Sequence, residues 1–322
     1  MIYRIRQGIL LFPRPIQSQG LKEIEPIYEH LLSKIRLTTL LLLVILVCGG
    51  SLNVGAAGCE ETAKQTTAIP SLDKTPDTGK VELDREYFKG YFTDTVHILS
   101  SPLRWDKTDW FTAAAVVGVA AGLYAYDSDI QVWSQKNRND TTDRIANIFT
   151  PFGNGLYTVP ALGLFYAYGY AADDSKARKT ALLGIESFIV SSAFTGVLKF
   201  ATHRYRPSDG GRYDQWDGPS FSGSNLSFPS EHTSSAFAIA TVLANEYNDN
   251  IFVGALSYSV ATMVALSRIN DNEHWASDVF FGAAIGYFTA KTITALHKPK
   301  KNIMIIPGTD GKGASLSLAI RY

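Results

Sequence analysis

The chain has 322 residues and 46% of them are apolar, which excludes a wholly disordered protein because this composition supplies a sizeable buried core. Its 30 basic residues balance its 30 acidic ones and no long basic run occurs, so we expect no nucleic-acid partner. The two cysteines, Cys48 and Cys59, lie near the start, which excludes a disulfide framework or a cysteine-rich metal site in the remainder.

Residues 1–58 are interpreted as an N-terminal leader, either a signal peptide or a membrane anchor. Two basic residues precede an apolar core at 37–47, and small residues follow this core, which is typical of a secretory signal. The segment that ends at Cys59 also resembles the lipobox of bacterial lipoproteins, although Ala56 stands where lipoboxes usually have leucine. The pattern leaves open whether the leader is cleaved, lipidated at Cys59 or retained as an anchor.

Residues 59–80 are rich in Thr, Lys, Pro, Asp and Gly, and they are predicted to form a polar linker. The folded domain predicted over residues 81–300 contains six apolar stretches, each too long for an ordinary strand, and these predict helices. The stretches are 111–126, 155–172, 180–200, 233–247, 251–267 and 278–297. Together they predict an all-α fold, a compact bundle of six helices.

The last residues, 301–322, follow a different pattern. Apolar side chains alternate with polar or small ones from Ser315 to Tyr322, after an isoleucine-rich run at 303–306 and a glycine-rich turn at 308–313. Alternation on both sides of a turn indicates two paired strands. We therefore predict a short C-terminal β-hairpin that folds against the helical domain.

Polar residues gather in three clusters at the ends of the predicted helices. The first holds Lys199, Arg206 and Pro207, the second holds Pro229, Ser230 and His232, and the third holds Ser267, Arg268, His274 and Asp278. Lys199 and Arg206 are seven residues apart, so they point to the same side of a helix. Pro229 and Ser230 open a helix, and the free N–H groups of a helix N-terminus suit an anion.

These residue types are suited to a tetrahedral oxyanion. Guanidinium groups match the geometry of phosphate and lysine adds a point charge, so the three cations predict a phosphate-binding cage. The carboxylate of Asp278 is predicted to accept the Nδ1 proton of His274, which leaves Nε2 free to attack phosphorus. His232 is then predicted to protonate the leaving oxygen and later to activate water.

The spacing Lys-x6-Arg-Pro, then Pro-Ser-x-His, then Ser-Arg-x5-His-x3-Asp resembles the signature of the type 2 phosphatidic acid phosphatase and vanadium haloperoxidase superfamily. The resemblance implies a core of six helices, with the first motif closing the third helix and the second opening the fourth. It implies that phosphate is bound by Lys199, Arg206, Ser230 and Arg268. It further implies that His274 is the nucleophile and forms a phosphohistidine, that Asp278 assists it, and that His232 is the general acid. For the phosphatases it implies no metal, and we expect no cofactor.

One residue departs from the family pattern. Glu231 stands between the serine and the histidine of the second motif, where the family usually has glycine. A carboxylate facing phosphate would repel it, so the side chain is expected to turn outward. An acidic residue at a helix N-terminus is itself favourable.

Three further features are interpreted less specifically. His203 is expected to be structural, and Glu186 is either a buried partner of a cation or part of a solvated face. The segment 208–227, which has no periodicity and lies between two motifs, is predicted to be a lid or specificity loop. A disordered connector is the alternative for this segment.

The predicted helix ends also constrain the relation to a membrane. If the leader exports the chain and all six helices span a bilayer, the motifs face the cytoplasm, whereas bacterial members of the family usually work on the outer side. Stretches such as 111–126 reach about 24 Å as a helix, against a hydrocarbon core of about 30 Å. We therefore expect an exported, periplasm-facing protein of the bacterial cell envelope that is membrane-tethered or membrane-associated. An integral six-span inner-membrane protein is the alternative.

The predicted activity is that of a metal-independent phosphatase of phosphomonoester or pyrophosphate groups. The substrate is expected to be a phosphorylated lipid, of the phosphatidic acid or polyprenyl pyrophosphate type, or a small phosphoester. Three alternatives stay open: a soluble nonspecific acid phosphatase, a vanadate-dependent haloperoxidase, and a non-catalytic envelope module in which Glu231 has spoiled the site.

Overall fold

The computed structural model describes residues 85–298, 302–309 and 314–321. All of the described residues belong to a single unit of the chain. The predicted leader (1–58) and linker (59–80) lie outside the described residues.

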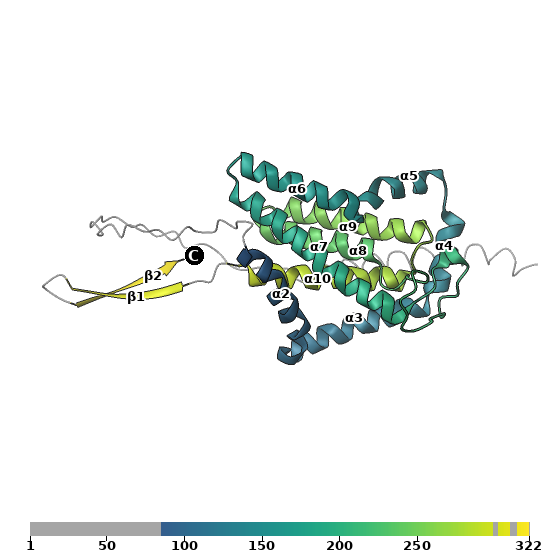
Figure 1. Cartoon of the computed structure of the whole chain (residues 1–322), viewed down its shortest axis with the longest axis horizontal. Coiled ribbons are helices and arrows are strands. Elements are labelled where there is room, and N and C mark those ends of the chain that lie inside the picture. Colours follow the sequence, from purple (N-terminus) through teal and green to yellow (C-terminus); the bar gives the residue numbers. More distant parts are fainter. Residues whose placement is uncertain (1–84, 299–301, 310–313, 322) are drawn as a thin grey trace, which may run out of the picture. The chain divides into compact units, whose positions relative to one another are not determined.

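Between residues 85 and 298 the described structure has nine α-helices and three short 3-10 helices, joined by turns and by a long loop at 203–230 (Figure 1). The α-helices are α2 (Arg85–Leu99), α3 (Lys107–Ala125), α4 (Asp127–Asn137), α5 (Asp140–Phe149), α6 (Gly155–Ala171), α7 (Ser175–Thr202), α8 (Glu231–Glu246), α9 (Ile251–Asn270) and α10 (Ala276–Leu296). The 3-10 helices are η1 (Ser101–Arg104), η2 (Thr150–Gly153) and η3 (Pro207–Asp209).

The mostly helical class is confirmed, and each of the six apolar stretches falls in one of the helices α3 and α6 to α10. The predicted count of six does not hold for the described residues, because α2, α4 and α5 are additional. The helices α2 and α4 have a mean hydropathy close to or below zero, so a search for apolar stretches does not find them. The side chain of Asn139 caps the start of α5 by accepting hydrogen bonds from Thr141 N and Thr142 N, which stabilises this polar helix.

The helix α8 lies among α7, α9 and α10, and α6 packs on α7 (Figure 1). Short turns join α6 to α7, α8 to α9 and α9 to α10, so consecutive helices run in opposite directions. This topology brings the ends of α7 and α9 to the same end of the bundle as the starts of α8 and α10. The polar clusters of the sequence stand at those ends.

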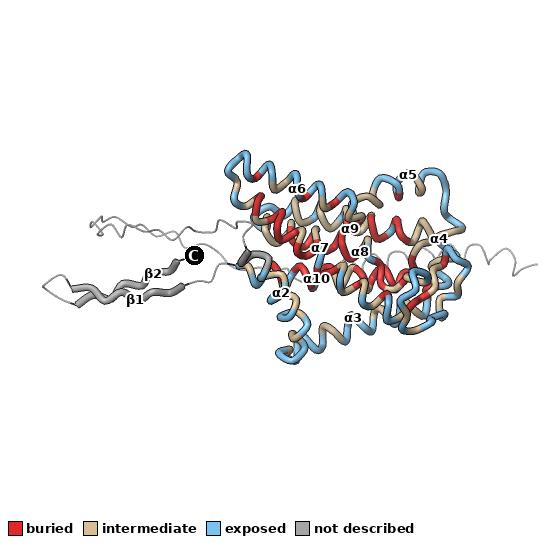
Figure 2. The backbone as a smooth tube through the Cα atoms, viewed as in Figure 1, coloured by how far each residue is buried: buried red, intermediate tan, exposed pale blue. Residues whose placement is uncertain are grey.

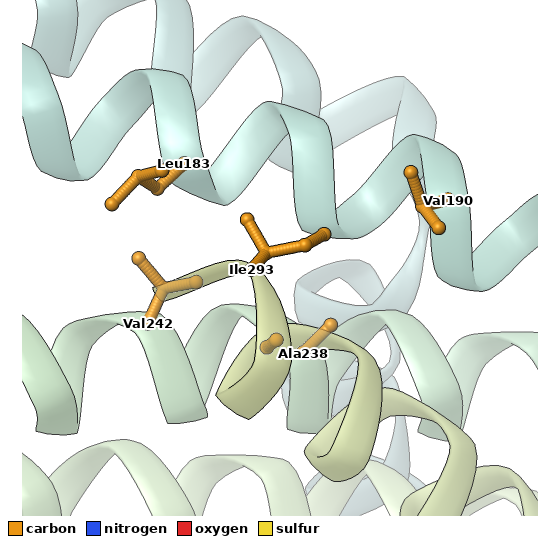
Figure 3. Packing of buried hydrophobic residues seen from close by; sticks show 6 residues of the cluster. Leu183, Val190, Ala238, Val242 and Ile293 are labelled. Carbon is orange, nitrogen blue, oxygen red and sulfur yellow. The ribbon is translucent and has the colours of Figure 1, made fainter. Parts of the chain in front are cut away.

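The buried core lies between α7, α8 and α10, where most buried positions are found (Figure 2). Its apolar cluster consists of Leu183, Val190, Ala238, Val242, Ala290 and Ile293. Figure 3 shows Ile293 of α10 directed between α7 and α8. Small polar residues fill much of the rest of this core, and Glu186 is also fully buried there, which decides against a solvated face for that residue.

Glycines allow α8 and α10 to approach closely. A Cβ atom at Gly282 would overlap the carbonyl oxygen of Ser230, and one at Gly286 would overlap that of Ser234. Gly153 similarly lies against the carbonyl oxygen of His232. The start of α8 is therefore held by backbone contacts that tolerate no added side-chain atom.

Residues Asn302–Thr309 (β1) and Ala314–Arg321 (β2) pair as antiparallel strands, in a register that sets Asn302 opposite Arg321 and Thr309 opposite Ala314. The packing of this segment against the helical domain stays a prediction.

Four described helices are long and apolar enough to cross a membrane, namely α3, α7, α9 and α10. The helix α3 carries no buried residue, although it is strongly apolar. It packs one side against α10 with half-buried residues, and the rest of its apolar surface is available to lipid.

We predict that Gly286→Ala destabilises the domain by about 1–3 kcal/mol, because the added methyl group forces α8 and α10 apart. Thermal unfolding in detergent measures this as a lower midpoint. Gly163→Ala in α6 is the matched control, since a Cβ there meets no atom within 4 Å and alanine favours a helix. Equal midpoints for Gly286→Ala and the wild type would contradict the close packing of α8 on α10.

Candidate functional site

The seven predicted site residues all lie at the same end of the bundle. Lys199 is in the last turn of α7, and Arg206 follows that helix. Ser230 is the N-cap of α8, and His232 is in its first turn. Arg268 is in the last turn of α9, whereas His274 precedes α10 and Asp278 is in the first turn of α10. Ser230 N donates to Asp278 O at 3.0 Å, which joins the starts of α8 and α10 directly.

The charges at this end act on one another. Burial, followed by the charges of Arg268, His274, Lys199 and Arg206, lowers the pKa of His232 to about 4. These four groups come from two helices, α7 and α9, and from two loops, and they surround His232, which places the predicted cations and both histidines in one site. Without a bound anion, His232 is neutral at neutral pH.

The Nδ1 atom of His274 has a different partner from the predicted one. It lies 2.7 Å from the backbone oxygen of Ser227 but 3.9 Å from Oδ2 of Asp278. Burial lowers the pKa of His274 to about 4, with Asp278 acting in the opposite direction. The neutral ring therefore donates its Nδ1 proton to the Ser227 carbonyl and keeps a lone pair on Nε2.

The predicted hydrogen bond from His274 to Asp278 is wrong because other donors occupy the carboxylate. Its Oδ1 accepts from Arg204 Nη1 at 2.5 Å. Its Oδ2 accepts from Ser227 Oγ at 2.6 Å and from Trp275 N at 3.0 Å. Asp278 is fully buried, so it acts on His274 through its charge at 3.9 Å and through the residue that both share, Ser227.

Sequence reasoning missed Ser227, which is fully buried and makes three contacts at the site. Its carbonyl oxygen faces His274, its hydroxyl donates to Asp278, and its N–H donates to Arg204 O at 3.0 Å. The residue lies three positions before Ser230, but a backbone carbonyl leaves no signal in a sequence. Only its position next to the second motif could have drawn attention to it.

The predicted phosphate-binding cations have partners within the described structure. Lys199 Nζ donates to Leu226 O at 2.6 Å. The guanidinium of Arg206 pairs with Glu273. Arg268 pairs with Asp271 at 2.5 Å.

Arg268 also donates to the hydroxyl of Thr150, which lies in η2. Asp271 and Glu273, the two acidic partners of the arginines, both belong to the turn between α9 and α10. None of these three residues belongs to a predicted motif, although Asp271 and Glu273 fall between Arg268 and His274 of the third motif.

The start of α8 is open to an anion. Within the described residues, no side chain caps this helix, and the Oγ atom of Ser230 lies 3.0 Å from that of Thr233. Glu231 is exposed, and its charge acts on that of Lys199, so its outward orientation stays a prediction. The positive end of the helix dipole therefore faces the side on which the cations gather.

The segment 208–227 is a folded loop on the end of α7, so the alternative of a disordered connector is wrong. Its backbone bonds to the preceding residues include Asp217 N to His203 O at 3.2 Å and Ser220 N to Phe200 O at 3.0 Å. The ring of His203 also joins it, with its two nitrogens 3.1 Å from Phe200 O and 3.0 Å from Ser222 O. His203 is therefore structural, as expected.

One group of residues in the described structure could hold a metal ion, and it lies apart from this site. It consists of Asp94 in α2, Glu186 in α7 and His297 after α10, with ligand atoms within 4.8 Å of one another. In the structure Asp94 already pairs with His297, 3.6 Å apart.

The segment that contains this site is similar to known proteins. Residues 180–302 match the PAP2 superfamily, and this range includes all seven predicted site residues. The chain is 48% identical over 61 residues to the lipid A 1-phosphatase of Porphyromonas gingivalis, which covers 19% of this chain and 14% of that protein. It is 31% identical over 149 residues to a PA-phosphatase related-family protein of Dictyostelium discoideum, which covers 41% of this chain and 55% of that protein.

The chain thus spans 14% and 55% of the length of these two relatives. Two solved structures are also similar. The crystal structure of Aquifex aeolicus LpxE has 22% sequence identity and a TM-score of 0.42, and the match covers 52% of this chain and 93% of that one. The first transmembrane PAP2 type phosphatidylglycerolphosphate phosphatase from Bacillus subtilis has 15% identity and a TM-score of 0.42, covering 66% and 94%. On the match of residues 180–302 and the motifs within it, the chain carries a domain of the PAP2 superfamily.

Proposed function

We propose that this chain is a phosphoric ester hydrolase of the cell envelope that removes phosphate or pyrophosphate groups from lipids through a phosphohistidine, without a metal. The observation that carries the proposal is the convergence of three cations and two histidines at the open start of α8. The PAP2 match over the same residues supports it.

The cations supply the binding of the phosphoryl group. Lys199, Arg206 and Arg268 neutralise its oxygens, and the N–H groups at the start of α8 donate to it next to Ser230. Phosphoryl transfer needs mainly positioning and charge neutralisation from a protein. The carboxylates of Asp271 and Glu273 hold the two arginines in place until phosphate binds.

The two histidines supply the nucleophile and the acid. Nε2 of His274 forms a bond to phosphorus while the bond from phosphorus to the ester oxygen breaks, and its electron pair stays on the leaving oxygen. His232 gains a proton when the phosphate dianion binds among the cations, and it gives this proton to the leaving oxygen. The ring of His274 keeps its Nδ1 proton on Ser227 O and becomes cationic. Water, deprotonated by His232, then displaces His274 and restores both rings.

A lipid substrate is the favoured class for two reasons. The relative with the highest identity over its matched residues among those described above is a lipid A 1-phosphatase, and four helices of this chain are apolar enough to cross a membrane. We place the site on the outer side, with the chain membrane-tethered or membrane-associated. The helix α3 runs toward the site, because Asp127 just after it contacts Ser277. If the N-terminus were exported and all six apolar helices crossed the membrane, α3 would end on the inner side and the site would lie there. We therefore do not combine an exported N-terminus with six spanning helices.

We predict that the purified chain releases phosphate from lipid phosphates in mixed micelles with a chelator present, and that His274→Ala lowers the rate by at least about 1000-fold. The loss follows because alanine has no nitrogen atom that can attack phosphorus in place of His274 Nε2. His97→Ala on the exposed face of α2 is the control and keeps the wild-type rate. No release from any lipid or soluble ester would contradict the proposed function, and halide oxidation that requires vanadate and peroxide would favour a haloperoxidase.

We predict that binding of a tetrahedral dianion at pH 6 is accompanied by proton uptake. The pKa of His232 is about 4 in the unliganded site, and a dianion offsets the surrounding positive charges and raises it. Calorimetric titration with sulfate, which does not titrate in this range, in two buffers of different ionisation enthalpy gives the proton number, at most about one. Uptake of the same size in His232→Gln would show that another group takes the proton.

We predict that Glu231→Gly changes KM and kcat by less than about threefold, because solvent screens the charge of this exposed carboxylate. Steady-state kinetics on the same lipid phosphate measures this. Activity that appears only in the glycine variant would instead support the alternative of a spoiled, non-catalytic site.

A further inference from the structure

A chain of buried charges extends from the site to α4. Arg204, Asp127 and Asp278 are each fully buried. Arg204 Nη1 lies 2.5 Å from Asp278 Oδ1, and Arg204 Nη2 lies 2.7 Å from Asp127 Oδ2. One guanidinium therefore bridges two carboxylates from different helices.

Arg204 is closed off from any substrate. Its Nε and Nη2 groups also donate to Tyr213 O, at 3.1 and 2.8 Å. The guanidinium carbon lies 4.9 Å from the ring centre of Tyr124, 4.8 Å from that of Trp216 and 5.5 Å from that of Trp275. With its donors used and its faces covered, Arg204 differs from Arg206, whose side chain is partly exposed at the rim.

Asp127 is the first residue of α4 and contacts the start of α10. Its Oδ1 accepts from Ser277 N at 2.9 Å and its Oδ2 from Ser277 Oγ at 2.5 Å. Ser277 Oγ also lies 2.8 Å from Arg204 Nη1. Asp127 thus fixes the residue next to Asp278 as well as the cation that binds Asp278.

We infer that Asp127 and Arg204 are positioning residues for the reaction, which hold Asp278 in place and leave its charge available to the His274 ring. This inference rests on the proposed function. Asp127, Arg204 and Asp278 together carry one net negative charge. The His274 ring gains a positive charge when it attacks phosphorus, and Asp278 Oδ2 lies 3.9 Å from it.

Removal of the Asp127 charge changes this balance. Arg204 and Asp278 then neutralise each other, and no net negative charge faces the cationic ring. The groups that bind phosphate are untouched, so substrate binding is expected to stay the same while the chemical step slows. Replacement of a residue that only stabilises the fold would not lower kcat while leaving KM unchanged.

The test compares Asp127→Asn with Ser277→Ala. The first removes a charge at constant size, whereas the second removes hydrogen bonds of the same network and leaves its charges in place. We expect Asp127→Asn to lower kcat on a lipid phosphate about 10- to 100-fold, with KM within about threefold, and Ser277→Ala to stay within about threefold in both. Asp127→Glu retains the charge and is expected to recover part of kcat.

A second measurement does not use turnover. Vanadate can adopt the five-coordinate geometry of the attack on phosphorus, so its inhibition constant is expected to rise at least about 10-fold in Asp127→Asn while that of inorganic phosphate stays the same. If Asp127→Asn does not fold, Asp127→Ser replaces it, since it also removes the charge and keeps a polar side chain, and the same split is expected.

The outcomes separate the two hypotheses. A wild-type protein without phosphatase activity would overturn the proposed function and this inference with it. An active wild type with unchanged kcat in Asp127→Asn, or with equal losses in Asp127→Asn and Ser277→Ala that follow their unfolding midpoints, would overturn the inference and leave the proposed function standing.

Discussion

The site depends on one buried carboxylate, that of Asp278. It accepts hydrogen bonds from Arg204, from the hydroxyl of Ser227 and from the backbone of Trp275, so the end of α7, the loop before α8 and the start of α10 meet on it. A buried carboxylate is stable only when it is paired and hydrogen-bonded. The same contacts that satisfy it fix the carbonyl oxygen that orients the His274 ring.

The helix packing makes this meeting point possible. Gly282 and Gly286 bring the backbone of α10 against that of α8, and the Ser230 N–H then reaches the Asp278 carbonyl. Because these are contacts between backbones, they set the distance between the two helix starts closely. The apolar cluster between α7, α8 and α10 holds the same three helices together further from the site.

Two features limit the net positive charge of the site. The arginines pair with acidic residues of the turn between α9 and α10, and both histidines are neutral because burial lowers their pKa to about 4. Neutral histidines suit a nucleophile that needs a lone pair. The three cations raise the free-energy cost of protonating His232, and an anion that binds among them lowers this cost.

The sequence determined the helical class, the six apolar helices and the seven residues that meet at the site, because apolar stretches and motif spacing are local in the chain. It did not determine the partners of those residues. Ser227 contributes through a backbone carbonyl, Arg204 resembles any charge at a helix end, and Asp127 lies some 70 residues before the first motif. The polar helices α4 and α5 were missed because they carry no apolar stretch. Only the tertiary structure could decide these contacts, because a hydrogen bond between distant residues depends on how helices pack and not on the spacing of residues along the chain.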